Sequence, residues 1–352
     1  MKTCHRGVSR RALLSGLAGG VVGSGIARTS FAHETETVSL ALDWYPNANH
    51  AGIYLAEADD LFHDADLTLD VYTPADPTTV LQTVGAGRDD FGISYQTDVL
   101  LARAQGVPVV SVAAFVQQPL VTVMALKEMG VTSPAALAGL SVGYPGIPSQ
   151  QAFLATMLEG AGLAIEDVSL VNIGFNLLPA LISGQVDAVL GGFWTHETII
   201  AAREGYEIDV LRVEDWGVPP YYELVMVASE ETVANRADLA SSFLSVIQDG
   251  YVSAIAEPER AVEALVEAYP ELDVEVEREG IALLAEVWLP EEPPVFGHQD
   301  PARWASYGEW MASRGLIPGD LDVGSAFVTD LLPVAVGTPA PSSGSSAMTV
   351  RQ

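Results

Sequence analysis

Short apolar runs bounded by Gly, Pro or Asn alternate along this chain with segments whose apolar residues recur every three or four positions. The first pattern is typical of buried strands, and the second of helices that pack one face on a core. Strands are predicted at residues 38–42, 67–72, 121–125, 140–143, 168–173, 208–213 and 224–228. Helices are predicted at residues 51–59, 151–160, 240–255, 258–268, 275–287 and 303–314. Strands and helices in alternation indicate an α/β fold with parallel strand pairs.

The same order of elements occurs twice in the chain. In each copy a short helix closed by glycine leads through an aspartate into a buried strand, with Asp90 before residues 91–93 and Asp187 before residues 188–190. The strand, loop and helix upstream of this block match as well. We therefore predict two tandem β-α-β-α-β units, each with a parallel sheet built by right-handed crossovers.

The length of 352 residues exceeds that of one typical core, which also favours two lobes. We expect the extended runs 121–125 and 224–228 to lie where the chain crosses between the lobes, as a two-crossing hinge. The late helices then return the chain to the first lobe. The predicted domains are a signal peptide, a discontinuous first lobe, a second lobe and a disordered tail, at residues 1–32, 33–120 with 226–335, 121–225, and 336–352.

The first residues predict export from the cytoplasm. Arg10 and Arg11 precede an uncharged, Gly- and Ala-rich run at 12–27, and the small residues up to Ala32 suit cleavage by a signal peptidase. The paired arginines match the twin-arginine pattern, with an ordinary secretory signal as the alternative. Because the only cysteine, Cys4, lies in this segment, the mature chain offers no disulfide, thiol nucleophile or sulfur metal ligand. No later stretch is long and apolar enough to span a membrane.

The formal net charge of −30 narrows the possible partners. A chain this acidic repels phosphate backbones, so nucleic-acid binding is excluded as a function class. Lys127 is the only lysine beyond the predicted signal peptide. An acidic, lysine-poor surface reflects a salty habitat or solubility outside the cell, and it says little about the substrate.

The densest set of chemically versatile residues follows the first predicted strand, at positions 43–50 (Asp-Trp-Tyr-Pro-Asn-Ala-Asn-His). This octet lies where a strand gives way to a helix, at the sheet edge where open α/β folds bind ligands. Its carboxylate, aromatic rings, amides and imidazole suit a flat, nitrogen-rich small molecule. The alternative is a Pro-containing turn in which Trp44 packs in the core, Asn47 caps the following helix and His50 packs at the start of that helix.

Corresponding loops of the two units supply further candidates. Asp43 and Glu223 are predicted to accept hydrogen bonds from an exocyclic amine, because a charge-assisted bond selects for an amino group. A solvated carboxylate at a strand start is the alternative for Glu223. His196 and Glu197 either line the cleft or begin the next helix. The predicted ligand-binding residues are Asp43, Trp44, Asn47, His50, Tyr95, Gln96, Tyr144, Gly146, Ser149, Asn176, Phe193, Trp194, Tyr222 and Glu223.

Three motifs together resemble one family: the octet at 43–50, Gly-Tyr-Pro-Gly at 143–146, and Gly-Val-Pro-Pro-Tyr-Tyr-Glu at 217–223. That family comprises the substrate-binding proteins of ABC transporters for thiamine pyrimidine precursors, formylaminopyrimidine or hydroxymethylpyrimidine, which are related to the eukaryotic thiamine-pyrimidine synthase. The resemblance covers about residues 38–333. It implies a type II periplasmic-binding-protein fold that closes on an aminopyrimidine-like ligand without catalysis, cofactor or metal. A monomer at the outer face of the membrane would then deliver this ligand to an ABC permease.

Two alternatives remain open. Riboflavin, another small heterocycle or a sulfonate would suit the same fold, because fold alone does not choose the ligand. A secreted enzyme related to the pyrimidine synthase is the lower alternative. By the resemblance, such an enzyme needs an active-site lysine and a cysteine-rich motif, whereas Lys127 is badly placed and the mature chain has no cysteine. The motifs of serine hydrolases, phosphate-binding loops and paired-histidine metal sites are also missing from the sequence.

Overall fold

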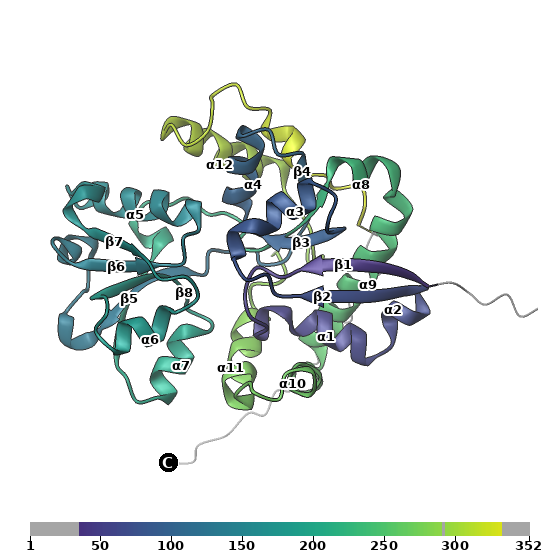
Figure 1. The fold of residues 1–352 in the computed structure, drawn as a ribbon, viewed down its shortest axis with the longest axis horizontal. Helices are drawn as coiled ribbons and strands as arrows, with labels where there is room; N and C mark the ends of the chain where they lie inside the picture. Colours follow the sequence, from purple (N-terminus) through teal and green to yellow (C-terminus); the bar gives the residue numbers. More distant parts are fainter. Residues whose placement is uncertain (1–34, 291–292, 333–352) are drawn as a thin grey trace, which may run out of the picture. The chain divides into compact units, whose positions relative to one another are not determined.

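A computed structural model of the chain describes residues 35–290 and 293–332 (Figure 1). The predicted signal peptide and the predicted tail lie outside these described residues. Two five-stranded sheets form the frame. The first sheet has the order β2 (Leu67–Tyr72), β1 (Glu36–Ala41), β3 (Phe91–Ser94), β10 (Val225–Ser229) and β4 (Val109–Ala114). The second has the order β7 (Ser169–Asn172), β6 (Ser141–Tyr144), β8 (Ala188–Phe193), β5 (Val121–Leu126) and β9 (Ile208–Arg212).

Helices cover both sheets, and we call each sheet with its helices a lobe. On the first lobe these are α1 (Ala51–Ala58), α2 (Leu61–Asp64), α3 (Val80–Gly85), α4 (Gln96–Ala104), α8 (Glu230–Asn235), α9 (Ala237–Ala256), α10 (Pro258–Ala268), α11 (Val274–Leu284) and α12 (Pro301–Ser313). On the second lobe they are α5 (Pro148–Gly160), α6 (Leu177–Ile182) and α7 (Glu197–Arg203). Within the described ranges, no helix is both long and apolar enough to cross a membrane.

The tandem units have the parallel pairing that the sequence predicts. Strand β1 runs parallel to β2 and β3, and β6 runs parallel to β7 and β8. The expectation of two wholly parallel sheets is corrected, because β10 and β5 run antiparallel to their neighbours. Each of these strands follows an extended crossing from the other lobe instead of a helical crossover, and only a parallel connection needs such a crossover. The sheets are therefore mixed.

A matched side-chain clasp shows that the repeat is structural. Ser39 donates to Asp90 Oδ2 from its backbone N (2.9 Å) and its Oγ (3.0 Å), and its Oγ accepts from Asp90 N (2.8 Å). Ser141 and Asp187 make the same three bonds at 2.8, 2.6 and 3.0 Å. Each clasp ties the first strand of a unit to the start of its third strand. In both units, the same three hydrogen bonds therefore fix how the first strand aligns with the third.

The predicted bounds of one strand and one helix agree with the structure residue for residue. Strand β2 and helix α10 occupy the predicted residues, 67–72 and 258–268. Strand β4 and helix α4 were not predicted, although the apolar run at 109–114 is typical of a buried strand. Helices α1 and α9 approach so closely that a Cβ on Gly250 would lie 2.2 Å from the Gly52 carbonyl oxygen. This contact buries α1, and with it the end of the octet, in the first lobe.

Two segments without regular secondary structure, residues 115–120 and 217–224, connect the sheets and pair with each other. Phe115 N donates to the Leu224 carbonyl oxygen (2.8 Å), and Glu223 N donates to the Val116 carbonyl oxygen (3.0 Å). Helix α12 packs beside this crossing, where Arg303 Nη1 donates to the Gln117 carbonyl oxygen (2.6 Å). The two crossings therefore lie side by side and are hydrogen-bonded to each other between the sheets.

Candidate functional site

A narrow pocket, with a cavity volume of about 10 Å³, lies between the two lobes. Four of its lining residues come from the first lobe: Asp43, Trp44, Asn47 and Tyr95. Six come from the second lobe: Ile147, Gln150, Gly191, Phe193, His196 and Glu197. They lie at or just after the carboxyl ends of β1, β3, β6 and β8, where open α/β sheets bind ligands.

Asp43 is the central acceptor on the first-lobe side and is buried. Its Oδ1 lies 3.1 Å from His50 Nε2, and its Oδ2 accepts from the Tyr95 hydroxyl at 2.9 Å. Because His50 Nδ1 accepts from Asn47 N (3.2 Å), the ring proton is assigned to Nε2, which donates to Asp43. Burial and the Asp43 carboxylate raise the pKa of Tyr95 well above its usual value, so its hydroxyl remains a donor. Two fixed donors orient the carboxylate, whose remaining lone pairs can bind a ligand.

Asn47 caps the helical turn before α1, as one of the two interpretations of the sequence predicted, and it also lines the pocket. Its Oδ1 accepts from Asn49 N and Asn49 Nδ2, each at 2.9 Å, which caps the short helical turn before α1. Its Nδ2 donates to the Tyr45 carbonyl oxygen at 2.9 Å. The same side chain lines the pocket. The octet is thus held by its own hydrogen bonds as well as by the core below it.

The second-lobe side carries a buried amide. Gln150 is 3 % exposed, and its Oε1 accepts no hydrogen bond from any residue that the structure describes. A Cβ on Gly191 would lie 2.7 Å from Gln150 Nε2 and Oε1, and Gly191 has a φ of +108°. Only glycine therefore leaves room for this amide beside the strand. An unpartnered buried amide in a pocket is a group that a ligand can satisfy.

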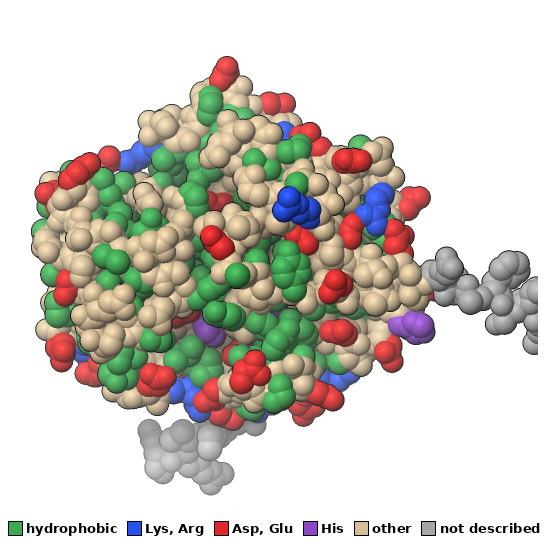
Figure 2. Space-filling view, in the orientation of Figure 1, with side chains coloured by type: hydrophobic (Ala, Val, Ile, Leu, Met, Phe, Trp, Pro, Cys, Tyr) green, Lys and Arg blue, Asp and Glu red, His purple; other side chains and the backbone are tan. Residues whose placement is uncertain are grey.

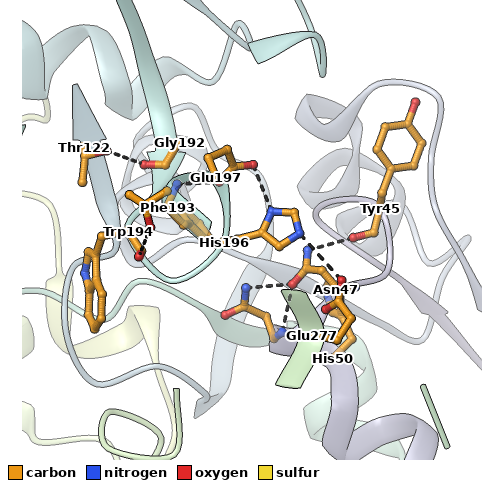
Figure 3. Close-up of polar contacts among 12 residues, drawn as sticks. Tyr45, Asn47, His50, Thr122, Gly192, Phe193, Trp194, His196, Glu197 and Glu277 are labelled. Carbon is orange, nitrogen blue, oxygen red and sulfur yellow. Dashed lines mark hydrogen bonds and ion pairs between the residues drawn. The ribbon is translucent and has the colours of Figure 1, made fainter. Parts of the chain in front are cut away.

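His196 and Glu197 close the same side of the pocket (Figure 3). Glu197 Oε2 accepts from Phe193 N at 2.7 Å, and its Oε1 lies 3.2 Å from His196 Nδ1. His196 Nε2 is 4.0 Å from Oε1 of Glu277, which belongs to α11 of the first lobe. Burial lowers the pKa of His196, but the carboxylates of Glu197 and Glu277 raise it by more. The imidazole therefore lies between carboxylates of the two lobes.

Five of the fourteen predicted residues line this pocket: Asp43, Trp44, Asn47, Tyr95 and Phe193. The other nine lie outside the lining: His50, Gln96, Tyr144, Gly146, Ser149, Asn176, Trp194, Tyr222 and Glu223. The structure holds no ligand, so a binding role for any of the fourteen stays a prediction. Their contacts nevertheless show what each side chain does in the folded chain.

Glu223 stabilises the two segments that cross between the lobes, by accepting hydrogen bonds from them. It is 1 % exposed, so the alternative of a solvated carboxylate is wrong. Its Oε2 accepts from Leu120 N (2.6 Å), Val121 N (3.1 Å) and the Tyr221 hydroxyl (2.8 Å). Burial raises the pKa of Glu223 to about 7, against the opposing effect of these donors.

Three other predicted residues serve the same crossing. Gln96 Oε1 accepts from Tyr222 N at 2.7 Å, and the Tyr222 hydroxyl accepts from Asp300 N at 2.7 Å. Trp194 Nε1 donates to the Pro119 carbonyl oxygen at 3.1 Å, and the Arg212 guanidinium lies 4.5 Å from its ring centroid. These side chains fix the segments about which the lobes would rotate.

Ser149 contacts the opposite lobe. Its Oγ donates to Asp98 Oδ2 (2.7 Å) and its backbone N donates to Asp98 Oδ1 (3.2 Å). Asp98 lies on α4 of the first lobe, and burial raises its pKa to about 6 although both bonds from Ser149 oppose the shift. The pair is a direct hydrogen-bonded link between the lobes.

The remaining three predicted residues belong to second-lobe loops. The Tyr144 hydroxyl accepts from Gln151 Nε2 at 2.6 Å. Gly146 turns the loop with a φ of +87°, and Asn176 is an exposed residue at the start of α6. Sequence reasoning missed Ile147, Gln150 and Gly191, although the turn at 144–150 was correctly placed at a sheet edge. The signal for Gly191 was the pair of glycines inside β8, since glycine within a strand often marks a close approach.

Comparison with known proteins identifies the family of the chain. The family model described as NMT1/THI5 like matches residues 47–261. The chain belongs to this family. The resemblance derived from the three sequence motifs is therefore confirmed.

The proteins that this chain resembles include a binding protein and a synthase. Formylaminopyrimidine-binding protein of Halalkalibacterium halodurans is 38% identical over 84% of this chain and 91% of its own length. A putative thiamine biosynthesis protein of Haemophilus influenzae is 34% identical over 85% and 93%. A 4-amino-5-hydroxymethyl-2-methylpyrimidine phosphate synthase of Legionella pneumophila is 29% identical over 67% and 74%.

The fold of this family member matches that of solved binding proteins. The alkanesulfonate-binding protein SsuA of Xanthomonas axonopodis superposes with a TM-score of 0.67 at 15% identity, covering 84% of this chain and 99% of that one. An identity this low carries information on the fold alone. The fold is that of type II periplasmic binding proteins, as the motif resemblance implied.

Proposed function

We propose that this protein is an extracytoplasmic solute-binding protein that captures a thiamine pyrimidine precursor and delivers it to an ABC permease. The observation that carries the proposal is Asp43, a buried carboxylate held by His50 and Tyr95 at a pocket between two lobes. The 38% identity to a formylaminopyrimidine-binding protein supports the ligand class.

The lining chemistry complements a 4-aminopyrimidine. The exocyclic amine donates to Asp43 in this proposal, and Glu197 offers a second carboxylate across the pocket. Charge-assisted bonds of this kind are stronger than bonds between neutral groups. The unpartnered Gln150 Oε1 accepts from an N–H of the ligand, and Trp44 and Phe193 supply apolar walls for the ring faces.

The contacts between the lobes around the pocket support capture by lobe closure. The lobes meet at Ser149 with Asp98, and at Arg203 of α7, which lies 3.4 Å from Asp273 and 3.6 Å from Glu279. A ligand enclosed by both lobes must enter while they are apart. Closure is then driven by the higher affinity of the closed form for the ligand.

A non-catalytic role is part of the proposal. Among the ten lining residues, all within the described part of the chain, none is a lysine or a cysteine. Lys127 lies on the surface, where its Nζ is 3.2 Å from Glu207 Oε1. The more distant synthase relative keeps a catalytic role as the alternative, which turnover of a pyrimidine or the absorption of a bound cofactor in the purified protein would support.

The test is a titration of the ligand-stripped mature protein, followed by tryptophan fluorescence and calorimetry. We expect saturable binding of formylaminopyrimidine or hydroxymethylpyrimidine with a dissociation constant on the order of micromolar or tighter, and no binding of riboflavin. Solution scattering should show a smaller radius of gyration with ligand. Binding of riboflavin alone would show that the ligand is not a pyrimidine. A radius of gyration that does not change with ligand would contradict lobe closure.

A matched pair of tyrosine variants locates the site. Tyr95→Phe removes the donor to Asp43, so we expect pyrimidine affinity to fall about tenfold, the loss typical of one hydrogen bond to a charged group. Tyr144→Phe removes the same atom from a residue outside the pocket lining and should leave affinity within threefold of wild type. Equal losses would contradict the placement of the site.

A further inference from the structure

A second, larger cavity adjoins the pocket. Trp44, His196 and Glu197 line both spaces, so these side chains form the partition between them. The outer space has a cavity volume of about 570 Å³ and opens to solvent between α11 of the first lobe and α6 and α7 of the second. We call it the vestibule. A substituent on a ring held in the pocket would extend into it.

One wall of the vestibule is aromatic. The Phe175 ring centroid lies 4.4 Å from that of Trp44 in an edge-on arrangement and 4.5 Å from that of Tyr45. Trp44 and Tyr45 belong to the octet, whereas Phe175 comes from the loop before α6. Tyr45 is 56 % exposed, so its ring is available to a ligand and contributes little to the core.

The opposite wall contains a buried carboxylate. Acidic side chains are spread over the visible face of the molecule, so acidity alone does not distinguish the vestibule (Figure 2). Glu277 differs because it is 1 % exposed and its Oε2 accepts no hydrogen bond from any described residue. Burial raises the pKa of Glu277, and His196 together with the Ala48 N–H opposes that shift. A buried oxygen without a donor is costly, which calls for an explanation.

The only arginine in the vestibule lining does not supply that donor. Arg203 lies 3.4 Å from Asp273 and 3.6 Å from Glu279, so carboxylates already pair with its charge. Glu204 and Glu271 line the vestibule as well. An anionic substituent would be repelled here. A positively charged one would complement Glu277, whose Oε1 faces His196 at 4.0 Å while its Oε2 has no donor among the described residues.

We propose that the vestibule binds a positively charged substituent of the pyrimidine ligand, either a protonated amine or a quaternary nitrogen ring. Aromatic faces attract cations through the ring quadrupole, and a carboxylate shielded from water strengthens that attraction. The Glu277 carboxylate supplies the counter-charge, and Trp44, Tyr45 and Phe175 supply the ring faces. This inference rests on the proposed pyrimidine-binding function and defines which pyrimidines bind best.

The experiment compares three ligands that share one aminopyrimidine ring, by calorimetry at pH 7. The 5-hydroxymethyl compound is neutral, the 5-aminomethyl compound carries a protonated amine, and thiamine carries a quaternary thiazolium. We expect both charged ligands to bind wild-type protein at least tenfold more tightly than the neutral ligand. The advantage should shrink as salt is raised, because screening weakens charge interactions.

Two variants assign the effect to the vestibule. Glu277→Gln should reduce the advantage of the charged ligands to less than threefold, whereas Glu279→Gln, on the same helix and outside the lining, should preserve it. Because Tyr45 is largely exposed, Tyr45→Ala should fold normally and lower thiamine affinity by at least threefold.

The outcomes separate this inference from the function on which it rests. Equal affinity for neutral and charged pyrimidines overturns the vestibule proposal and leaves pyrimidine binding intact. Glu277→Gln lowering all three affinities by one factor shows a structural role and also overturns it. Failure of every pyrimidine to bind overturns both.

Discussion

The two repeated units share one scaffold but complete their ligand-facing loops differently. Both carry the same serine–aspartate clasp, with matched bonds at Ser39 and Ser141. After the first strand of the first unit, Asp43 of the octet is held within its own lobe by His50 and Tyr95. After the first strand of the second unit, Ser149 bonds to the opposite lobe instead.

The first lobe therefore carries a preformed half of the site, whereas the half on the second lobe is conditional, because it is completed only when the lobes meet. The first lobe presents an oriented carboxylate whatever the position of the second lobe, because all of its partners belong to that lobe. The second lobe brings Gln150, His196 and Glu197 into place only when the two lobes meet. We therefore infer that ligand binds first to the first lobe and that closure adds the remaining contacts.

The largest expected effect comes from the preformed half. Asp43→Asn removes the charge that His50 and Tyr95 orient, and we expect pyrimidine affinity to fall about 100-fold, the ~3 kcal/mol typical of a buried charged hydrogen bond. Glu223→Gln is the matched control, since this second buried carboxylate braces the crossing and should change affinity by less than tenfold. Calorimetry on both variants, with circular dichroism to check folding, decides between them.

Substitutions in the second-lobe half of the site should lower ligand affinity less, and the contact between Ser149 and Asp98 should make affinity depend on pH. Ser149→Ala removes a hydrogen bond between the lobes, so we expect about tenfold weaker affinity through faster ligand release. Burial raises the pKa of Asp98 from 3.8 to about 6, so the closed form holds this proton more tightly than lobes apart in solvent. Its contribution to closure is full below about pH 4 and is lost as pH rises through about 6.

Dissociation constants measured at pH 5, 6 and 7 would check this dependence. Asp98→Asn cannot titrate and should flatten the profile relative to wild type. An identical profile in the variant would assign the pH dependence to other groups, of which His196 and Glu277 also face each other between the lobes.

Glu223 provides a pH test of stability that is separate from binding. Burial raises the pKa of Glu223 from 4.5 to about 7, so the folded protein retains its proton to higher pH than the unfolded chain. Its contribution to the free energy of unfolding is full below about pH 4.5 and is lost as pH rises through about 7. Urea unfolding of wild type and Glu223→Gln across this range should give a difference that changes with pH. A constant difference would contradict the assigned pKa.

The smallest expected effect concerns the shared clasp. Ser39→Ala and Ser141→Ala each remove the hydroxyl that bonds an aspartate at a strand start, and each should cost about 1–2 kcal/mol of stability. Neither residue lines the pocket, so pyrimidine affinity should stay within threefold of wild type. Unequal costs, measured by denaturant unfolding, would show that the two units do not use the clasp in the same way.

The sequence by itself determined the repeated units, the strand at 67–72, the helix at 258–268 and the family. These features depend on local periodicity, turn chemistry and short motifs, all of which can be read within a few residues. The octet as a ligand-facing loop also followed from local order, because a strand-to-helix turn lies at a sheet edge.

Only the tertiary structure decided which of the candidate side chains share a pocket. Asp43 and Glu223 were equivalent as sequence candidates, yet Glu223 bonds to Leu120, 103 residues away, inside the crossing. Ser149 likewise faces Asp98 across 51 residues. Such pairings, like the antiparallel direction of β5 and β10, depend on how distant segments meet in the core. No local pattern records that arrangement, because it is selected by packing over the whole chain.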